Sequence, residues 1–175
     1  MSRLDAKSQG KFNTDVETSK VLDVLTDYGK GQGDWLDYYH LDEENSQYDP
    51  IFDEPVGAGR VFTLTQMPAI HVHLIYGANQ YGDFGMYYND EIAASISYRL
   101  FEQAGMTEAD IRDGRYERDR VVYKEKVFRI TTLNIQGQIQ RREIIVGLEG
   151  SQLKPDELVG DVAFAKYAQK NDTSN

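Results

Sequence analysis

The clearest pattern along the chain is the alternation of apolar and polar positions between residues 115 and 149. It predicts three strands, "DRVVY", "VFRITTLNI" and "QRREIIVGLE", with tight turns at "KEK" and "QGQ". Strands joined by turns this short run antiparallel. This region therefore predicts a three-stranded antiparallel meander.

Two further strands are predicted upstream of the meander. "RVFTLTQM" alternates, Pro68 is expected to break it, and "AIHVHLIY" alternates again after the proline. "GANQYGDFG" carries the glycines of a turn or loop. Alternation returns in "AASISYRL", after which "RLFEQAG" leads into another loop, and Thr107 is placed to cap a short helix at "TEAD".

Helical spacing is found near the N-terminus, in "DVETSKVLDVLTDYG", where Gly29 is expected to end the helix. A helix this short needs a surface to lie on. Together the patterns predict a mainly β fold: a small antiparallel β-barrel or sandwich with an extended N-terminal arm and one or two short helices. We expect the arm at residues 1–59, the barrel at 60–160 and a C-terminal tail at 161–175.

The composition reduces the number of functional classes to which the chain could belong. The 175-residue chain has a formal net charge of -10 and a pI near 4.7, which disfavours wrapping of nucleic acid by phosphate neutralisation. It has no cysteine, which excludes disulfides and thiolate chemistry. We find no secretion signal and no apolar run of about 18 residues that would span a membrane.

The charge is unevenly distributed. Residues 1–60 carry a net charge of -7, whereas residues 112–142 carry +5. Two interpretations stay open: a basic hairpin offsets acidic faces within one fold, or the acidic surface of one copy meets the basic surface of a neighbour.

Two groups of residues have side chains that could form a catalytic or metal site. His71 and His73 share one face of a strand, but a metal needs further ligands, so a small metal-binding β-barrel enzyme is kept only as an alternative. Asp49, Asp53 and Glu54 could form paired acids, yet nothing nearby supplies a nucleophile. We predict no catalytic residue, no metal ligand and no cofactor.

The same residue types suit contacts with partners. Aromatic and apolar residues before the barrel are either a cluster against the core or anchors for a partner. We assign them to a docking arm: Trp35, Tyr38, Tyr39, Tyr48, Ile51 and Phe52. Charged residues that we expect to meet a neighbouring subunit are Asp49, Asp53, Glu54, Arg115, Arg118, Arg120, Lys124 and Lys126.

The order of these features resembles the head-to-tail connector proteins of tailed bacteriophages, which include stopper, neck and head-completion proteins. The resemblance covers roughly residues 45–160. It is carried by "GRYERDRVVYKEK", which leads into "VFRITTLNI" and then into the strand that closes a small barrel. This sequence has Arg118-Asp119-Arg120 where such proteins often have Gly-Asp.

The resemblance implies a non-enzymatic virion protein, assembled in the host cytoplasm. It implies a homo-oligomeric ring at the head-to-tail joint that contacts a portal-side adaptor and a tail terminator or tail tube protein. Such a ring helps to retain packaged DNA, with DNA possible in its channel and no membrane involved. A tail terminator that caps the tail tube is the alternative. For a loop that contacts the lumen or a partner we single out residues 77–89, with Tyr81, Asp83, Phe84, Tyr87 and Tyr88.

Overall fold

The computed structural model describes residues 14–49, 51–52, 54–55, 59–82, 85–139, 142–158 and 161–168. Its elements follow in the order α2 (Thr14–Gln32), β1 (Trp35–Leu41), β2 (Tyr48–Asp49), β3 (Glu54–Pro55), β4 (Phe62–Gly82), β5 (Gly85–Ser97), α3 (Tyr98–Gln103), α4 (Glu108–Arg112), β6 (Arg120–Tyr123), β7 (Lys126–Ile139), β8 (Arg142–Gln152), η1 (Pro155–Leu158), η2 (Val162–Phe164) and α5 (Ala165–Ala168). Within these ranges no helix is long and apolar enough to cross a membrane.

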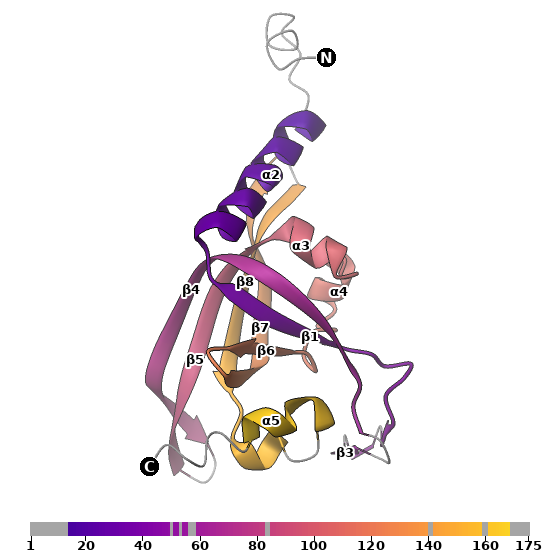
Figure 1. Ribbon diagram of the computed structural model, residues 1–175, viewed down its shortest axis with the longest axis vertical. Helices are drawn as coiled ribbons and strands as arrows, with labels where there is room; N and C mark the ends of the chain where they lie inside the picture. The colour runs from indigo at the N-terminus through magenta and orange to yellow at the C-terminus, as the bar shows by residue number, and fades with distance from the viewer. Residues whose placement is uncertain are drawn as a thin grey trace, which may run out of the picture.

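Six strands close into an antiparallel barrel in the order β1-β4-β5-β8-β7-β6. The predicted mainly β fold class is therefore confirmed, as a barrel rather than a sandwich. The molecule is elongated: α2 and the tip of the β7–β8 hairpin lie at one end, and the tip of the β4–β5 hairpin, β3 and α5 lie at the other (Figure 1).

The barrel interior is filled by one large apolar cluster. Leu36, Phe101 and Phe128 are among its fully buried members. The ring of Phe101, from α3, meets that of Tyr38, from β1, edge to face with centroids 5.6 Å apart. Such a pair adds about 0.5–1.5 kcal/mol beyond the burial of its area. The helix α3 is therefore part of the core, not of the loop that we expected at "RLFEQAG".

A second apolar cluster lies on the outer face of the barrel, because Tyr39 points away from the interior that its neighbour Tyr38 faces. The ring of Phe164 lies 4.9 Å from that of Tyr39 and 5.0 Å from that of Phe62. Tyr167 completes the cluster. The predicted C-terminal tail is therefore wrong for residues 161–168, which pack on the barrel; residues 169–175 lie outside the described ranges.

The barrel begins earlier in the chain than predicted. β1 pairs with β4 from Trp35↔Pro68 to Leu41↔Phe62, and its middle also pairs with β6. The expected arm over residues 1–59 is thus wrong for β1, which joins the two ends of the sheet. Both partners of β1 are distant in sequence, so no short hairpin turn marks it as a strand.

Pro68 does not end a strand, contrary to our expectation: β4 runs unbroken for 21 residues. Pro68 lies at the last β1–β4 pair, immediately before a register shift between Ala69 and His71 in the pairing with β5. A proline lacks a backbone N–H, and a sheet tolerates it where a ladder ends or bulges.

The two turns predicted in the meander had different outcomes. The "KEK" turn is confirmed: Lys124 (φ 48°) and Glu125 (φ 65°) both have the positive φ of a type I′ turn. The "QGQ" turn is wrong, because β7 continues through Gly137 to Ile139 and the hairpin turns after it. Paired with β8 at Gly137↔Ile145, the glycine is a position in the ladder.

The helix α2 is longer than predicted, since Gly29 lies inside it. Gly29 is buried, and a Cβ there would lie 3.2 Å from the carbonyl oxygen of Pro68. At Gly33, just beyond the helix, a Cβ would come within 1.8 Å of the carbonyl oxygen of Ala69. Both glycines therefore let the end of α2 approach the backbone of β4 closely.

One face of α2 is held against the barrel and the other is exposed. Thr26 Oγ1 donates a hydrogen bond of 3.0 Å to Ser97 Oγ, and Arg99 pairs with Asp23. On the outer face Val24 is 67% and Tyr28 51% exposed. The expected Thr107 cap is confirmed, with a full capping box at the start of α4.

Candidate functional site

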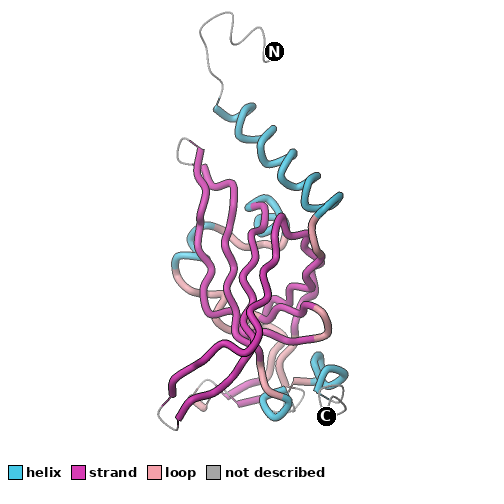
Figure 2. The backbone as a smooth tube through the Cα atoms, turned by 90° about the vertical axis from the view of Figure 1, so that its left-hand side faces the viewer, coloured by secondary structure: helices cyan, strands magenta, loops and turns pink. Residues whose placement is uncertain are grey.

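The segment predicted to be a loop is an arm made of two long strands. β4 and β5 stay paired from Ala78↔Asn89 to Gly82↔Gly85, beyond the body of the barrel (Figure 2). We expected a turn or loop from residue 77, and that is wrong because strand pairing continues almost to the tip. Tyr81, Tyr87 and Tyr88 lie on this arm, and Asp83 and Phe84 lie outside the described ranges.

The base of the arm is fixed by Asp90. Its Oδ1 accepts a 2.9 Å hydrogen bond from the N–H of Gly77, whose φ is +64° beside a β-bulge, and Oδ2 binds the ammonium of Lys126. Burial alone raises the pKa of Asp90, but the hydrogen bonds from Lys126 and Gly77 lower it overall. Lys126 also lies 5.2 Å from the ring centroid of Tyr76. Lys126 thus has partners within the subunit, and its role as an inter-subunit charge stays a prediction.

The predicted docking residues divide into buried and exposed sets. Tyr38 is 1% and Tyr39 6% exposed, so both belong to the barrel and their assignment as docking anchors is wrong. Trp35 stays half exposed at the start of β1. Tyr48 is in β2, where its backbone pairs with Pro55.

Two strongly exposed apolar side chains lie between β2 and β3. Ile51 is 81% and Phe52 71% exposed. The Oδ1 atom of Asp49 accepts a 2.8 Å hydrogen bond from the N–H of Ile51, which holds a local turn at this position. Glu54 follows in β3, and Asp53 lies outside the described ranges. Ile51 and Phe52 thus stand exposed beside the carboxylate of Asp49.

The basic residues predicted to meet a neighbour also differ in exposure. Arg120 is 5% exposed, and burial, with Arg129 nearby, lowers its pKa to about 10, so its assignment to the surface is wrong. The Nη1 atom of Arg115 lies 3.1 Å from Asp110 Oδ1, with most of its side chain exposed. Lys124 is exposed, and Arg118 is partly buried.

A buried carboxylate that sequence reasoning missed connects β1 to the loop before β6. Asp119 has no exposed surface. It accepts hydrogen bonds from the hydroxyl of Tyr38 (2.5 Å) and from the N–H of Leu41 (2.9 Å), and its Oδ2 lies 2.9 Å from Nδ1 of His40. No local signal marks this network, since its partners are about 80 residues apart in the chain.

The network changes the proton affinities of its members. Burial, followed by the charge of Asp119, raises the pKa of Tyr38 well above its usual value. The hydrogen bond to Asp119 raises the pKa of His40, which is partly opposed by burial. His40 therefore favours its charged form and ties β1 to Asp119.

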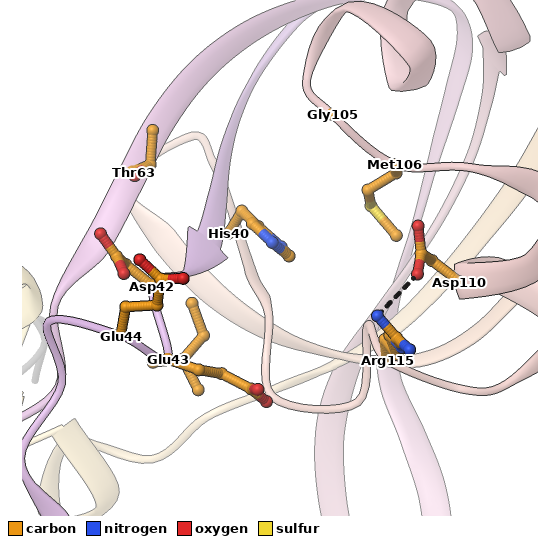
Figure 3. A pocket seen from close by; sticks show the side chains of 10 residues that line it. His40, Asp42, Glu43, Glu44, Thr63, Gly105, Met106, Asp110 and Arg115 are labelled. Atoms are coloured by element: carbon orange, nitrogen blue, oxygen red, sulfur yellow. Dashed lines mark ion pairs between the residues drawn. The ribbon is translucent and has the colours of Figure 1, made fainter.

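His40 lines a polar cleft with a volume of about 300 Å³. Figure 3 shows acidic residues beyond the end of β1 on one side, with Met106, Asp110 and Arg115 on the other. The acids on the β1 side are Asp42, Glu43 and Glu44. Carboxylates thus outnumber cationic groups in the cleft, and a cationic side chain of a partner would complement it.

The histidine pair has the geometry that the strand pattern predicts. The rings of His71 and His73 lie on one face of β4 with centroids 6.5 Å apart, and both residues are exposed. Within the described ranges, no three His, Cys, Asp or Glu side chains are grouped to hold a metal ion.

No protein-family model matches the chain, and no curated protein matches it. Among solved structures, it is similar to a chain of the virion of a native gene transfer agent (GTA) particle. The sequence identity is 10% and the TM-score 0.41, and the match covers 69% of this chain and 94% of that chain. A likeness at this level carries no functional argument.

Proposed function

We propose that the chain is a structural, non-enzymatic subunit of a phage-like virion. In this proposal its copies form a ring at the head-to-tail joint, between a portal-side adaptor and the tail terminator or tail tube protein. The ring helps to hold packaged DNA in the head, as in the stopper and neck proteins that the sequence resembles.

The observation that carries the proposal is the contrast between a closed, well-filled barrel and extensions that leave apolar side chains in solvent. Val24 and Tyr28 on α2 and Ile51 and Phe52 in the β2–β3 loop are all more than half exposed. Exposed apolar residues of this size are typical of surfaces that associate. The extensions lie at both ends of the long axis, as suits a subunit that joins two other parts (Figure 1).

The charge of the chain fits a channel through which DNA passes. A subunit with a net charge of -10 repels phosphate groups at long range, so a ring of such subunits lets DNA move without binding it tightly. The β4–β5 arm is the element that we propose reaches the lumen or an adjacent ring, because it extends beyond the barrel from a fixed base at Asp90.

The direct test is to delete the gene from its native genome and to examine the particles by electron microscopy. We expect filled or leaking heads that lack attached tails, and recovery of complete particles when the wild-type gene is restored. Cryo-electron microscopy of complete particles then locates the chain. Density for the chain anywhere but the neck would defeat the proposal, as would normal particles from the deletion strain.

The role of the arm has a separate test. Residues 78–89 are replaced by an Asn-Gly turn, which leaves the pairs of β4 with β1 and of β5 with β8 intact. We expect the variant to fold and to enter particles that lose DNA. As a matched control, the tip of β7–β8 is shortened by replacing residues 138–143 with the same turn. Equal DNA retention in the arm variant and wild type would remove the arm from the proposal.

A further inference from the structure

The outer face of the sheet formed by β4, β5 and β8 has a shallow hollow with a volume of about 290 Å³. Its lining includes the small residues Ala93 and Ser151, together with Glu149. Ala93 points outward, because its neighbours Ile92 and Ala94 are buried in the barrel interior. The small residues let another element of structure pack closely against the strands at this place.

One row of cross-strand neighbours includes two residues of this hollow. His73 of β4 pairs with Ala93 of β5, and Ala93 pairs in turn with Glu149 of β8. His73 and Glu149 are both exposed, and within the described ranges neither side chain forms an ion pair. The row therefore presents an imidazole at one end and a carboxylate at the other, with a methyl group between them.

The exposed face of α2 carries side chains in a matching order. Lys20, Val24 and Asp27 lie on the side of the helix opposite the buried residues Thr18 and Thr26. Val24 is 67% exposed. In the part of the chain that the structure describes, neither Lys20 nor Asp27 forms an ion pair. This face thus presents an ammonium group and a carboxylate with an apolar side chain between them.

The spacing of the charges on the helix agrees with that on the sheet. Lys20 and Asp27 are seven residues apart, which corresponds to a rise of about 10.5 Å along an α-helix. Glu149 and His73 are two strands apart, which corresponds to about 10 Å. A copy of α2 laid across the strands therefore brings Lys20 to Glu149 and Asp27 to His73 at the same time. The imidazole can carry a positive charge there, so opposite charges meet at both ends.

The apolar side chains fit the same arrangement. Val24 comes to lie over Ala93, whose small side chain leaves room for it. Tyr28, which is 51% exposed, follows Asp27 and lies over β4, where Ile75 is 40% exposed. The contact thus removes apolar side chains of both surfaces from water.

The exposed face of α2 belongs against another copy, not against its own sheet. Thr26 is hydrogen bonded to Ser97, and Asp23 pairs with Arg99, so the opposite side of the helix is fixed to its own barrel. In Figure 1, α2 lies at the top, whereas β4 and β5 lie on the left. A contact between two different surfaces of identical subunits is heterologous, and it closes into a ring when the rotation between copies allows it.

We propose that the exposed face of α2 packs across the outer face of the β4–β5–β8 sheet of the next copy, with Val24 over Ala93. In this contact Lys20 faces Glu149, and the acidic residue one turn after Val24 faces His73. The contact is repeated from copy to copy. The inference rests on the proposed function for the ring, and it adds the two surfaces that build it.

The test uses the absence of cysteine from the chain. Two full-length variants, Val24→Cys and Ala93→Cys, carry one cysteine each, so every disulfide joins two copies. Equal amounts are mixed at high concentration under mild oxidation, and the disulfides are mapped by mass spectrometry. We expect the mixed 24–93 disulfide well above the statistical share of random collisions, since a disulfide needs Cα atoms within about 7 Å of each other. In the matched control, Val162→Cys, at a site 76% exposed, replaces Val24→Cys and should give little product.

Each other result overturns the proposal. A dominant 24–24 disulfide means that α2 pairs with α2, and a dominant 93–93 disulfide means that two sheets meet face to face. Equal yields with the Val162→Cys control mean random collision, and no disulfide means that the two surfaces do not meet. Circular dichroism shows whether each variant is folded. If Ala93→Cys is not folded, Lys20→Cys and Glu149→Cys, both at exposed sites, form the test pair with the same expected result.

Charge reversal gives a second measurement. Lys20→Glu, added to the Val24→Cys variant, should lower the yield of the mixed disulfide at least roughly threefold, because it replaces an attraction by a repulsion. Glu149→Lys, added to the Ala93→Cys variant, should restore the yield. Lys166→Glu is the control, at an exposed position of α5. An unchanged yield in Lys20→Glu, or no recovery with Glu149→Lys, would overturn the proposed pairing of the two surfaces.

The contact and the proposed function fail separately. A chain that is located at the neck but gives no 24–93 disulfide overturns the contact alone. A chain that gives the disulfide but is located elsewhere in the particle overturns the neck location alone.

Discussion

The barrel and the β2–β3 loop use the same kinds of apolar residue in opposite ways. Tyr38 and Tyr39 are 1% and 6% exposed, whereas Ile51 and Phe52 are 81% and 71% exposed. The sequence segments look alike, each placing large side chains among acidic residues. The difference is that β1 is paired on both sides, by β4 and β6, and the loop is not. Burial here follows from distant strand pairing, not from local composition.

The largest effect on stability is expected inside the barrel, at Phe101. Its side chain is fully buried and packs against Tyr38, so Phe101→Ala should lower the free energy of unfolding by about 3–5 kcal/mol. Urea denaturation measures the change. The control Val24→Ala alters a side chain that is 67% exposed and should change stability by less than about 0.5 kcal/mol. Similar losses in both variants would contradict the assignment of core and surface.

The next effect is expected at Asp119. Asp119→Ala leaves the buried N–H of Leu41 without its acceptor and the hydroxyl of Tyr38 with only the weak acceptor Sδ of Met106, which should cost about 3 kcal/mol. Urea denaturation again gives the free energy. Tyr38→Phe should lower the free energy of unfolding less in the Asp119→Ala variant than in the wild-type protein, because it removes a hydroxyl that has already lost its bond to Asp119. Additive losses would show that the two groups are not coupled.

A smaller effect concerns pH. The pKa of His40 is raised in the folded state, so its bond with Asp119 contributes fully below the unfolded pKa of about 6.5 and is lost as pH rises through the folded value. Since the His40 side chain is 39% exposed, the gain should be under about 1 kcal/mol. Unfolding at pH 6 and pH 8 should differ less in His40→Gln than in wild type. His71→Gln is the control, and an unchanged pH dependence in His40→Gln would refute the expectation.

The smallest effect on stability is expected at the loop. Phe52→Ser should change the free energy of unfolding by less than about 0.5 kcal/mol, because the side chain is 71% exposed. Head-to-tail joining, counted by electron microscopy, should nevertheless fall. A variant that unfolds readily would mean that Phe52 stabilises the subunit, and the comparison between barrel and loop would then fail.

The features that sequence predicted well are local. The β6–β7 hairpin needs four strand residues, a two-residue turn and a partner directly after it, and all of these are adjacent in the chain. The capping box at Thr107 spans three residues. Each of these signals involves only residues that are close together in the sequence.

The features that the sequence did not predict depend on contacts between residues that are far apart in the chain. The closing of the barrel by β1 depends on pairs with Phe62 and Arg120, and no local pattern shows that they meet. In the sequence Asp119 stands out only as a departure from a turn motif, although its carboxylate binds Tyr38 and His40. In β7, a register shift between Ile130 and Thr132 moves Leu133 to the inside and defeats simple alternation.

The arm has a consequence for how the protein behaves alone. Every barrel strand has a neighbour on each side over part of its length, but within the described ranges β4 beyond Ala69 pairs only with β5, and β5 before Glu91 pairs only with β4. Their outer edges are templates onto which another strand can add through backbone hydrogen bonds, with little demand on side chains. Protein expressed without its partners should therefore tend to join arm to arm, and a partner that supplies a strand would suppress this by occupying an edge.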